Sequence, residues 1–90
     1  MEEKEKEIVI QNKLGLHARP ASQFVQLTSK FSSDIILRRG EEEVNGKSIM
    51  GVLMLAAPRG TKIKVIARGD DAGEALDRIE HLIANKFGEE

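Results

Sequence analysis

The residues best suited to chemistry lie in one short stretch of the sequence, Leu14-Gly15-Leu16-His17-Ala18-Arg19-Pro20. His17 falls between a predicted strand and a predicted helix, where its imidazole stands over the helix start and can hold a phosphoryl group covalently. A helix start leaves backbone N–H groups without partners and carries about half a positive elementary charge. Phosphate groups bind at such positions. A nucleophile and an anion-binding site therefore coincide within a few residues.

The neighbours of His17 strengthen this interpretation. The backbone amides of Ala18 and Arg19 can donate toward an anion, and the planar guanidinium of Arg19 matches phosphate oxygens. Pro20 restricts the turn that aims these groups. The spacing is also compatible with a plainer alternative, in which His17 caps the helix or packs in the loop and Arg19 is an ordinary surface side chain.

Ser48 is a second candidate, at the start of another predicted helix. Its hydroxyl can accept a hydrogen bond from an unpaired helix amide, which stabilises a helix by about 1 kcal/mol. Capping alone explains the residue. A phosphate added to Ser48 would also be favoured at a helix start, so we consider it a candidate site of regulatory phosphorylation.

The helix after Ser48 carries more apolar side chains than one face can bury. We expect four of them to point inward: Ile49, Val52, Leu53 and Ala56. Met50 and Met54 lie one turn apart on another side, and exposed methionines are typical of adaptable partner contacts. The alternative is that both methionines fill the core.

The remaining polar candidates favour structural roles. His81 lies next to Glu80 and one turn after Asp77, away from the apolar stripe of its helix, so we expect it on the surface. The run from Glu41 to Glu43 indicates a solvated hairpin tip, because neighbouring strand residues point to opposite faces. We expect no metal site.

Hydrophobic periodicity predicts the elements that position these residues. In chain order they are a strand at Ile8–Ile10, a helix over 18–30, a strand at Ile35–Leu37, a short strand around Val44, a helix at Ile49–Ala57, a strand at Thr61–Arg68 and a helix from Ala72 to before Gly88. The order βαββαβα predicts the α+β class, an open-faced sandwich with helices on one face of a mostly antiparallel sheet. Residues 1–90 are expected to form one domain.

Three local expectations accompany this assignment. The charged leader Met1–Glu7 precedes the first strand, and the strand at Thr61–Arg68 should have one wet face that Ile66 fits poorly. The sequence Asp71-Ala72-Gly73-Glu74 resembles a capping box, in which the side chains at either end of the motif bond backbone amides of the first helical turn.

Composition narrows the classes of function. The chain has 90 residues, a formal net charge of −1 and no cysteine, which disfavours general nucleic-acid binding and excludes disulfides and thiolate chemistry. RNA platforms stack bases on aromatic rings, whereas this chain has three Phe and neither Tyr nor Trp. No apolar stretch approaches the roughly 18 residues of a membrane helix, so we expect a cytoplasmic protein without membrane insertion.

The stretch Gly15-Leu16-His17-Ala18-Arg19-Pro20-Ala21 resembles the histidine-containing phosphocarrier (HPr) family of the bacterial phosphoenolpyruvate-dependent phosphotransferase system. The stretch Lys47-Ser48-Ile49-Met50-Gly51-Val52 resembles the regulatory-serine region of the same family, and the similarity extends from about Glu7 to Phe87. The resemblance implies a four-stranded antiparallel sheet in the order 1-4-2-3, covered by three helices.

The resemblance also implies a function. His17 would accept a phosphoryl group on Nδ1 from phosphorylated enzyme I and pass it to the A component of an enzyme II complex, with Arg19 and the Ala18 and Arg19 amides stabilising it. Ser48 would be the target of an ATP-dependent HPr kinase/phosphorylase. The expected docking residues are Pro20, Ile49, Met50 and Met54. A carrier of this kind is a monomer that is not itself an enzyme and needs no cofactor.

Ala56 and Met54 depart from the pattern of the sugar-transport branch, which often has glycine and a smaller polar residue there. An alternative is therefore the nitrogen-related regulatory branch of the system. A nucleic-acid-binding α+β module is the alternative from a different class.

Overall fold

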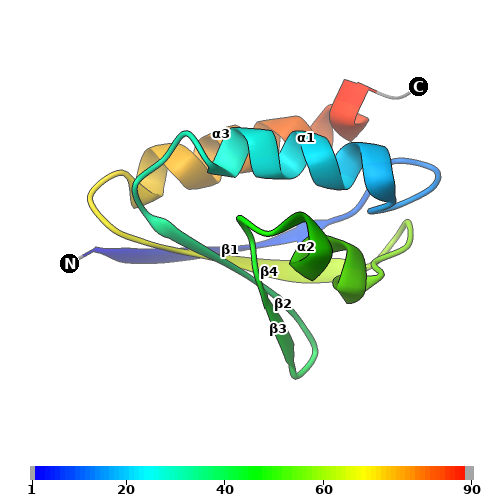
Figure 1. Ribbon diagram of the computed structural model, residues 1–90, viewed down its shortest axis with the longest axis horizontal. Coiled ribbons are helices and arrows are strands. Elements are labelled where there is room, and N and C mark those ends of the chain that lie inside the picture. The colour runs from blue at the N-terminus through cyan, green and yellow to red at the C-terminus, as the bar shows by residue number, and fades with distance from the viewer. Residues whose placement is uncertain (1, 89–90) are drawn as a thin grey trace.

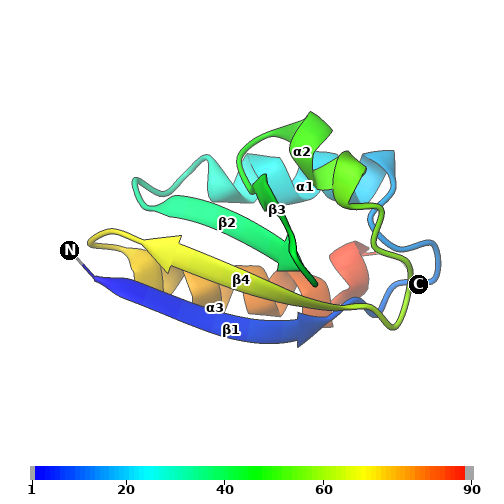
Figure 2. The ribbon, with the colours of Figure 1, turned by 90° about the horizontal axis from the view of Figure 1, so that it is seen from below.

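The computed structural model describes residues 2–88 and has the predicted order of elements. The elements are β1 (Glu3–Val9), α1 (Ala18–Thr28), β2 (Asp34–Arg39), β3 (Glu42–Asn45), α2 (Ile49–Leu55), β4 (Lys62–Arg68), α3 (Ala72–Ala84) and a terminal turn of 3-10 helix, η1 (Lys86–Gly88). Helices α1 and α3 lie side by side over one face of the sheet, and α2 lies beside α1 near β3 (Figures 1 and 2). The other face of the sheet is open.

The four strands form one antiparallel sheet in the order β1-β4-β2-β3. Ile8 on β1 lies opposite Ile63 on β4, and Leu37 on β2 lies opposite Val65 on β4. These positions point to the helix-covered face, because side chains alternate between faces along a strand. The predicted fold and strand order are confirmed.

The core fills the space between this face and the helices. Its largest fully buried apolar side chains are Phe24, Ile10, Ile35, Leu37, Leu55, Ile63, Ile79, Ile83, Val52 and Val65. Complete burial of one such side chain stabilises a fold by about 1.5 to 3 kcal/mol. Phe24 on α1 and Ile79 on α3 belong to this core, which holds both helices in place.

The charged leader was wrongly expected to precede the sheet, since β1 begins at Glu3. Two of its charged side chains form ion pairs with residues distant in the sequence. Glu3 accepts a 2.8 Å hydrogen bond from Arg68, and the ammonium of Lys6 lies 2.6 Å from a carboxylate oxygen of Glu80. The hydrogen bond to Glu80 raises the pKa of Lys6. An edge strand tolerates charged residues because half of its surface stays in water.

Ile66 shows that the open face of the sheet is not entirely exposed to solvent. It points away from the main core, yet only 2% of its surface is exposed. Ile36 on β2 and Glu5 on β1 lie directly opposite it. A small apolar centre on the open face therefore explains why the alternation of apolar and polar residues along this strand is broken at Ile66.

The predicted capping box at Asp71 is wrong. Asp71 is the N-cap residue of α3, but its side chain makes no capping hydrogen bond. Its carboxylate instead accepts hydrogen bonds from the backbone N–H groups of Ser32 at 2.9 Å and Ser33 at 3.0 Å, and from the Ser33 hydroxyl. These bonds connect the loop after α1 to the start of α3, and they lower the pKa of Asp71.

We expect Asp71→Asn to lower the free energy of unfolding at pH 7 and to weaken its dependence on pH. A carboxyl whose pKa is lowered by folding adds stability above its unfolded pKa of about 4, and this stability is lost as the pH falls through the lower, folded pKa. The difference between wild type and variant should therefore shrink as the pH falls below about 4. Urea unfolding at a series of pH values measures it.

The control is Asp70→Asn, because Asp70 is exposed and makes no side-chain hydrogen bond within residues 2–88. It should leave the pH dependence unchanged. A difference between wild type and Asp71→Asn that stays constant down to pH 2 would contradict the role assigned to the carboxylate.

Candidate functional site

His17 is the N-cap residue of α1. Its backbone is extended, with φ −86° and ψ −170°, and its side chain makes no capping hydrogen bond. The first helical bond runs from the N–H of Ala21 to the carbonyl of His17, at 2.9 Å. Because the side chain makes no capping hydrogen bond, the alternative in which it caps the helix is wrong, and the residue is partly exposed.

The amides of Ala18 and Arg19 follow directly. Both residues are exposed, and within residues 2–88 no hydrogen bond uses either backbone N–H. The first turn of α1 contains no acidic residue that would cancel the positive end of the helix. These N–H groups are those that any helix start leaves unpaired, and here they lie next to the imidazole. The arrangement suits a phosphate group.

The loop that carries His17 rests on the chain that follows α2. The N–H of Leu16 donates a 2.9 Å hydrogen bond to the carbonyl of Ala57. Gly15 has φ +71°, and a Cβ atom there would lie only 2.8 Å from Cα of Pro58. Only glycine fits this contact without a shift of the backbone. The position of His17 thus depends on residues about 40 positions further along the sequence.

The end of α2 is itself held from the sheet. Ala56 adopts the left-handed conformation, with φ 52° and ψ 43°. Arg39 on β2 donates from Nη1 to the carbonyls of Leu55, at 3.0 Å, and Ala56, at 2.8 Å. Arg39 therefore connects the sheet to the turn on which the His17 loop rests, a role that local sequence patterns did not indicate.

A shallow cavity of about 210 Å³ lies beside the imidazole. It is lined by Leu14, Leu16, His17, Ala56, Ala57 and Pro58. Leu14 is 68% exposed, and the sequence reasoning missed it. A sequence feature could have indicated its exposure: this leucine lies between Lys13 and Gly15, in a loop that precedes the histidine.

Ser48 caps α2 as predicted. Its backbone is extended, and its Oγ accepts a 3.1 Å hydrogen bond from the N–H of Gly51. The side chain is partly exposed, so its hydroxyl combines a structural role with access to solvent.

Apolar side chains on α2 are exposed to an unusual degree. Met50 is 67% exposed, Met54 is 66% exposed and Ile49 is 44% exposed, so the alternative in which the methionines fill the core is wrong. The inward position expected for Ile49 is also wrong. A helix of seven residues buries one narrow stripe, here Val52 and Leu55. Ala56 lies beyond that stripe, and it is exposed in the turn.

Pro20 does not fit the docking role expected of it. It is buried in the first turn of α1, together with Ala21 and Phe24. Its surface is covered by the protein itself. The proline instead fixes the backbone at the helix start, since its ring restricts φ and the amide it lacks would have had no partner there.

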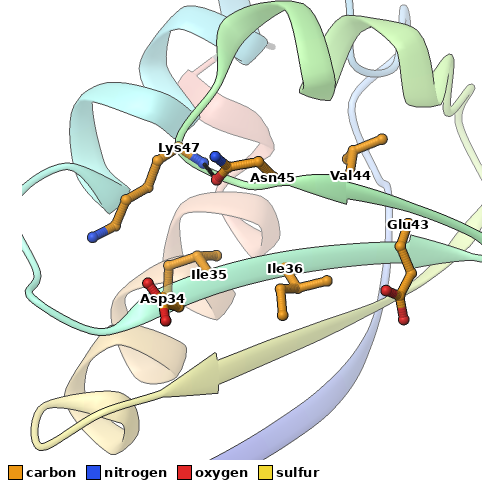
Figure 3. A pocket seen from close by; sticks show the side chains of 7 residues that line it. All are labelled: Asp34, Ile35, Ile36, Glu43, Val44, Asn45 and Lys47. Carbon is orange, nitrogen blue, oxygen red and sulfur yellow. Dashed lines mark hydrogen bonds between the residues drawn. The ribbon is translucent and has the colours of Figure 1, made fainter.

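A larger cavity, of about 420 Å³, lies against β2 and β3, and neither His17, Arg19 nor Ser48 lines it (Figure 3). Asp34 and Glu43 lie at opposite ends of this cavity, and Lys47 extends from the loop after β3 (Figure 3). Within residues 2–88, no cluster of three or more metal-binding side chains was found, nor a helix long and apolar enough to cross a membrane.

The fold and the site define a class: small α+β open-faced sandwiches that present a histidine and unpaired amides at a helix start, next to exposed apolar side chains. Residues 4–85 match the family model described as "PTS HPr component phosphorylation site". The chain therefore belongs to the HPr family, the phosphocarriers of the phosphotransferase system. The resemblance noted around His17 and Ser48 is confirmed.

Individual relatives agree over nearly the whole chain. The phosphocarrier protein HPr of Xylella fastidiosa (strain 9a5c) is 46% identical over 86 residues, which cover 96% of this chain and 97% of that protein. A crystal structure of HPr from Thermoanaerobacter tengcongensis covers 97% of this chain and 98% of its own at 52% identity, with a TM-score of 0.93. An HPr dimer from the same organism is 51% identical, with a TM-score of 0.78, over 91% of this chain and 94% of its own.

We expect Ala56→Gly to raise the free energy of unfolding by about 0.5 to 1 kcal/mol. A side chain in the left-handed region is strained by about 1 to 2 kcal/mol, and part of the relief is offset by the greater freedom of glycine in the unfolded chain. Thermal or urea unfolding measures the change.

The matched control is Ala84→Gly at the end of α3, where the backbone is helical. This substitution should lower stability by up to about 1 kcal/mol. Loss of stability in Ala56→Gly as well would show that the turn is not strained by its alanine.

Proposed function

We propose that this chain accepts a phosphoryl group on His17 from phosphorylated enzyme I and passes it to enzyme II A components for sugar uptake. The observation that carries the proposal is the pair of unpaired backbone amides, those of Ala18 and Arg19, directly after His17 at the start of α1. Membership of the HPr family supports it independently. On this proposal the chain is a carrier and not an enzyme, a cytoplasmic monomer with one domain over residues 1–90 and no cofactor.

The site supports the chemistry of a reversible carrier. In the accepting step, an imidazole nitrogen of His17, Nδ1 by analogy with the family, bonds to phosphorus while the bond between phosphorus and the donor breaks. The three phosphoryl oxygens then face the amides of Ala18 and Arg19 and the guanidinium of Arg19. A shallow site lets donor and acceptor reach the same phosphorus, because each must approach it in line.

The partners would dock on exposed apolar side chains: Leu14, which lines the cavity beside the imidazole, and Ile49, Met50 and Met54 on α2. Methionine side chains adapt to different surfaces, which suits a protein that binds a donor and several acceptors in turn. The nitrogen-related branch stays the alternative for the acceptors, since Met54 and Ala56 affect the choice of partner.

Ser48 is proposed as a regulatory site for an ATP-dependent HPr kinase/phosphorylase. A phosphate there would add about 1.5 to 2 negative charges at the start of α2, next to Ile49 and Met50. The helix start tolerates this charge, whereas an apolar docking surface does not. Phosphorylation of Ser48 would therefore weaken docking without unfolding the protein.

We expect incubation with phosphoenolpyruvate and enzyme I to label the wild-type protein with phosphate that is labile to acid and stable to alkali. His17→Ala should abolish this label, and Arg19→Gln should slow its appearance by about tenfold or more, because a charge-stabilising donor is lost. Phosphate release and mass spectrometry measure the label.

His81→Ala is the matched control, since it removes the second histidine of the chain and should label normally. Absence of label on the wild-type protein with a competent enzyme I would refute the proposal. Transfer of the label to sugar-specific A components, compared with nitrogen-related ones, distinguishes the two branches.

We expect the double variant Met50→Glu, Met54→Glu to raise the KM for phosphorylation by enzyme I by about tenfold, because buried carboxylates oppose apolar docking. Its free energy of unfolding should change little, as both side chains are exposed. Val9→Glu, which adds one carboxylate at an exposed apolar residue on the sheet, is the control and should leave the KM unchanged. An unchanged KM in the double variant would place the docking surface elsewhere.

A further inference from the structure

A groove of about 310 Å³ runs between α1 and α3 and lies apart from the His17 site. Its lining residues are Gln23, Gln26, Leu27, Lys30, Arg78, His81, Leu82 and Asn85. The first four come from α1 and the residues just after it, and the last four come from α3 and the residue just after it. Within each set of four the spacing is i, i+3, i+4 and i+7, which places the four residues on a single helix face. Two helix faces thus line one groove.

The two helices run in opposite directions, as the colour gradient in Figure 1 shows. Lys30 follows the end of α1 and therefore lies at the same end of the groove as Arg78 on α3. Leu27 and Leu82 lie in the middle, and Gln23 and Asn85 lie toward the other end. The groove thus has a cationic end, a middle in which Leu27 and Leu82 lie together with Gln26 and His81, and an amide end.

The basic residues of this groove differ from three of those on the sheet. Lys6, Arg38 and Arg68 each form an ion pair with a carboxylate. Within residues 2–88, Lys30 and Arg78 form none, and no acidic residue lines the groove. The cavity against β2 and β3, by contrast, combines Asp34 and Glu43 with Lys47, and a third cavity combines Arg38, Lys62 and Lys64 with Glu7. Of these three cavities, only the groove between α1 and α3 has basic lining residues and no acidic one, which suits an anion.

We propose that this groove binds a small phosphate monoester with a short apolar body. The phosphate dianion would lie between Lys30 and Arg78, whose guanidinium can form two parallel hydrogen bonds to phosphate oxygens. The body would cover Leu27 and Leu82, and polar groups at its far end would meet the side-chain amides of Gln23 and Asn85. The volume is at the lower end of known ligand pockets, which restricts the ligand to a small molecule.

The proposed site is distinct from the His17 site. Helix α1 has 11 residues and is therefore about 16 Å long, with His17 before its start and Lys30 beyond its end. A phosphate held by the amides of Ala18 and Arg19 cannot reach Lys30. Both sites can bind phosphate, so a test must report on each separately.

Phenyl phosphate is a suitable probe, and backbone amide NMR shifts distinguish the two sites. We expect titration to shift the amides of Lys30, Arg78, Leu82 and Asn85 along one saturable binding curve. Inorganic phosphate should bind there more weakly, because it lacks the apolar body, and uncharged benzyl alcohol should not saturate the groove.

The double variant Lys30→Gln, Arg78→Gln should weaken this binding about tenfold and leave any shifts at Ala18 and Arg19 unchanged. Lys62→Gln, Lys64→Gln removes the same charge from β4 on the open face and should bind like the wild type. Shifts confined to Ala18 and Arg19, or equal weakening by both double variants, would overturn the proposal. The amide spectrum of each variant also shows whether it is folded.

Discussion

The hydrogen bond between the N–H of Leu16 and the carbonyl of Ala57 is the constraint on which the site depends. A histidine in a free loop would sample many positions relative to the helix start. The backbone amides there could then not be held next to its imidazole. This bond, together with the close contact of Gly15 and Pro58, fixes the loop against a second segment. Preorganisation of this kind removes the entropy of ordering the loop from the transfer step itself.

The support for that second segment comes from the sheet. Arg39 holds the left-handed turn after α2 through two carbonyls, so β2, α2 and the His17 loop form one connected structure. The turn keeps an alanine where glycine would be relaxed, and the neighbouring core residues Val52 and Leu55 keep the helix in place despite the strain. Hydrogen bonds thus connect the His17 loop to α2 and the sheet, while Leu14, Met50 and Met54 stay exposed.

The sequence predicted the features that depend on local pattern and left out those that depend on distant contacts. The order of elements, the helix start at Ala18 and the cap at Ser48 all follow from neighbouring residues, whereas the strand order came from the family resemblance. Asp71 failed as a capping box because two serines 38 and 39 residues away use its carboxylate. The burial of Pro20 and the exposure of Leu14 and Ile49 depended on tertiary packing, which periodicity along one helix cannot show.

The short length of α2 has a mechanical consequence. A helix of seven residues is about 10 Å long, and it has the capping hydroxyl of Ser48 at one end and the support of the histidine loop at the other. So short a rod cannot bend appreciably, and a tilt at its first residue must displace its last. A rigid tilt of the whole helix would therefore move Ser48 and the turn that supports the His17 loop together.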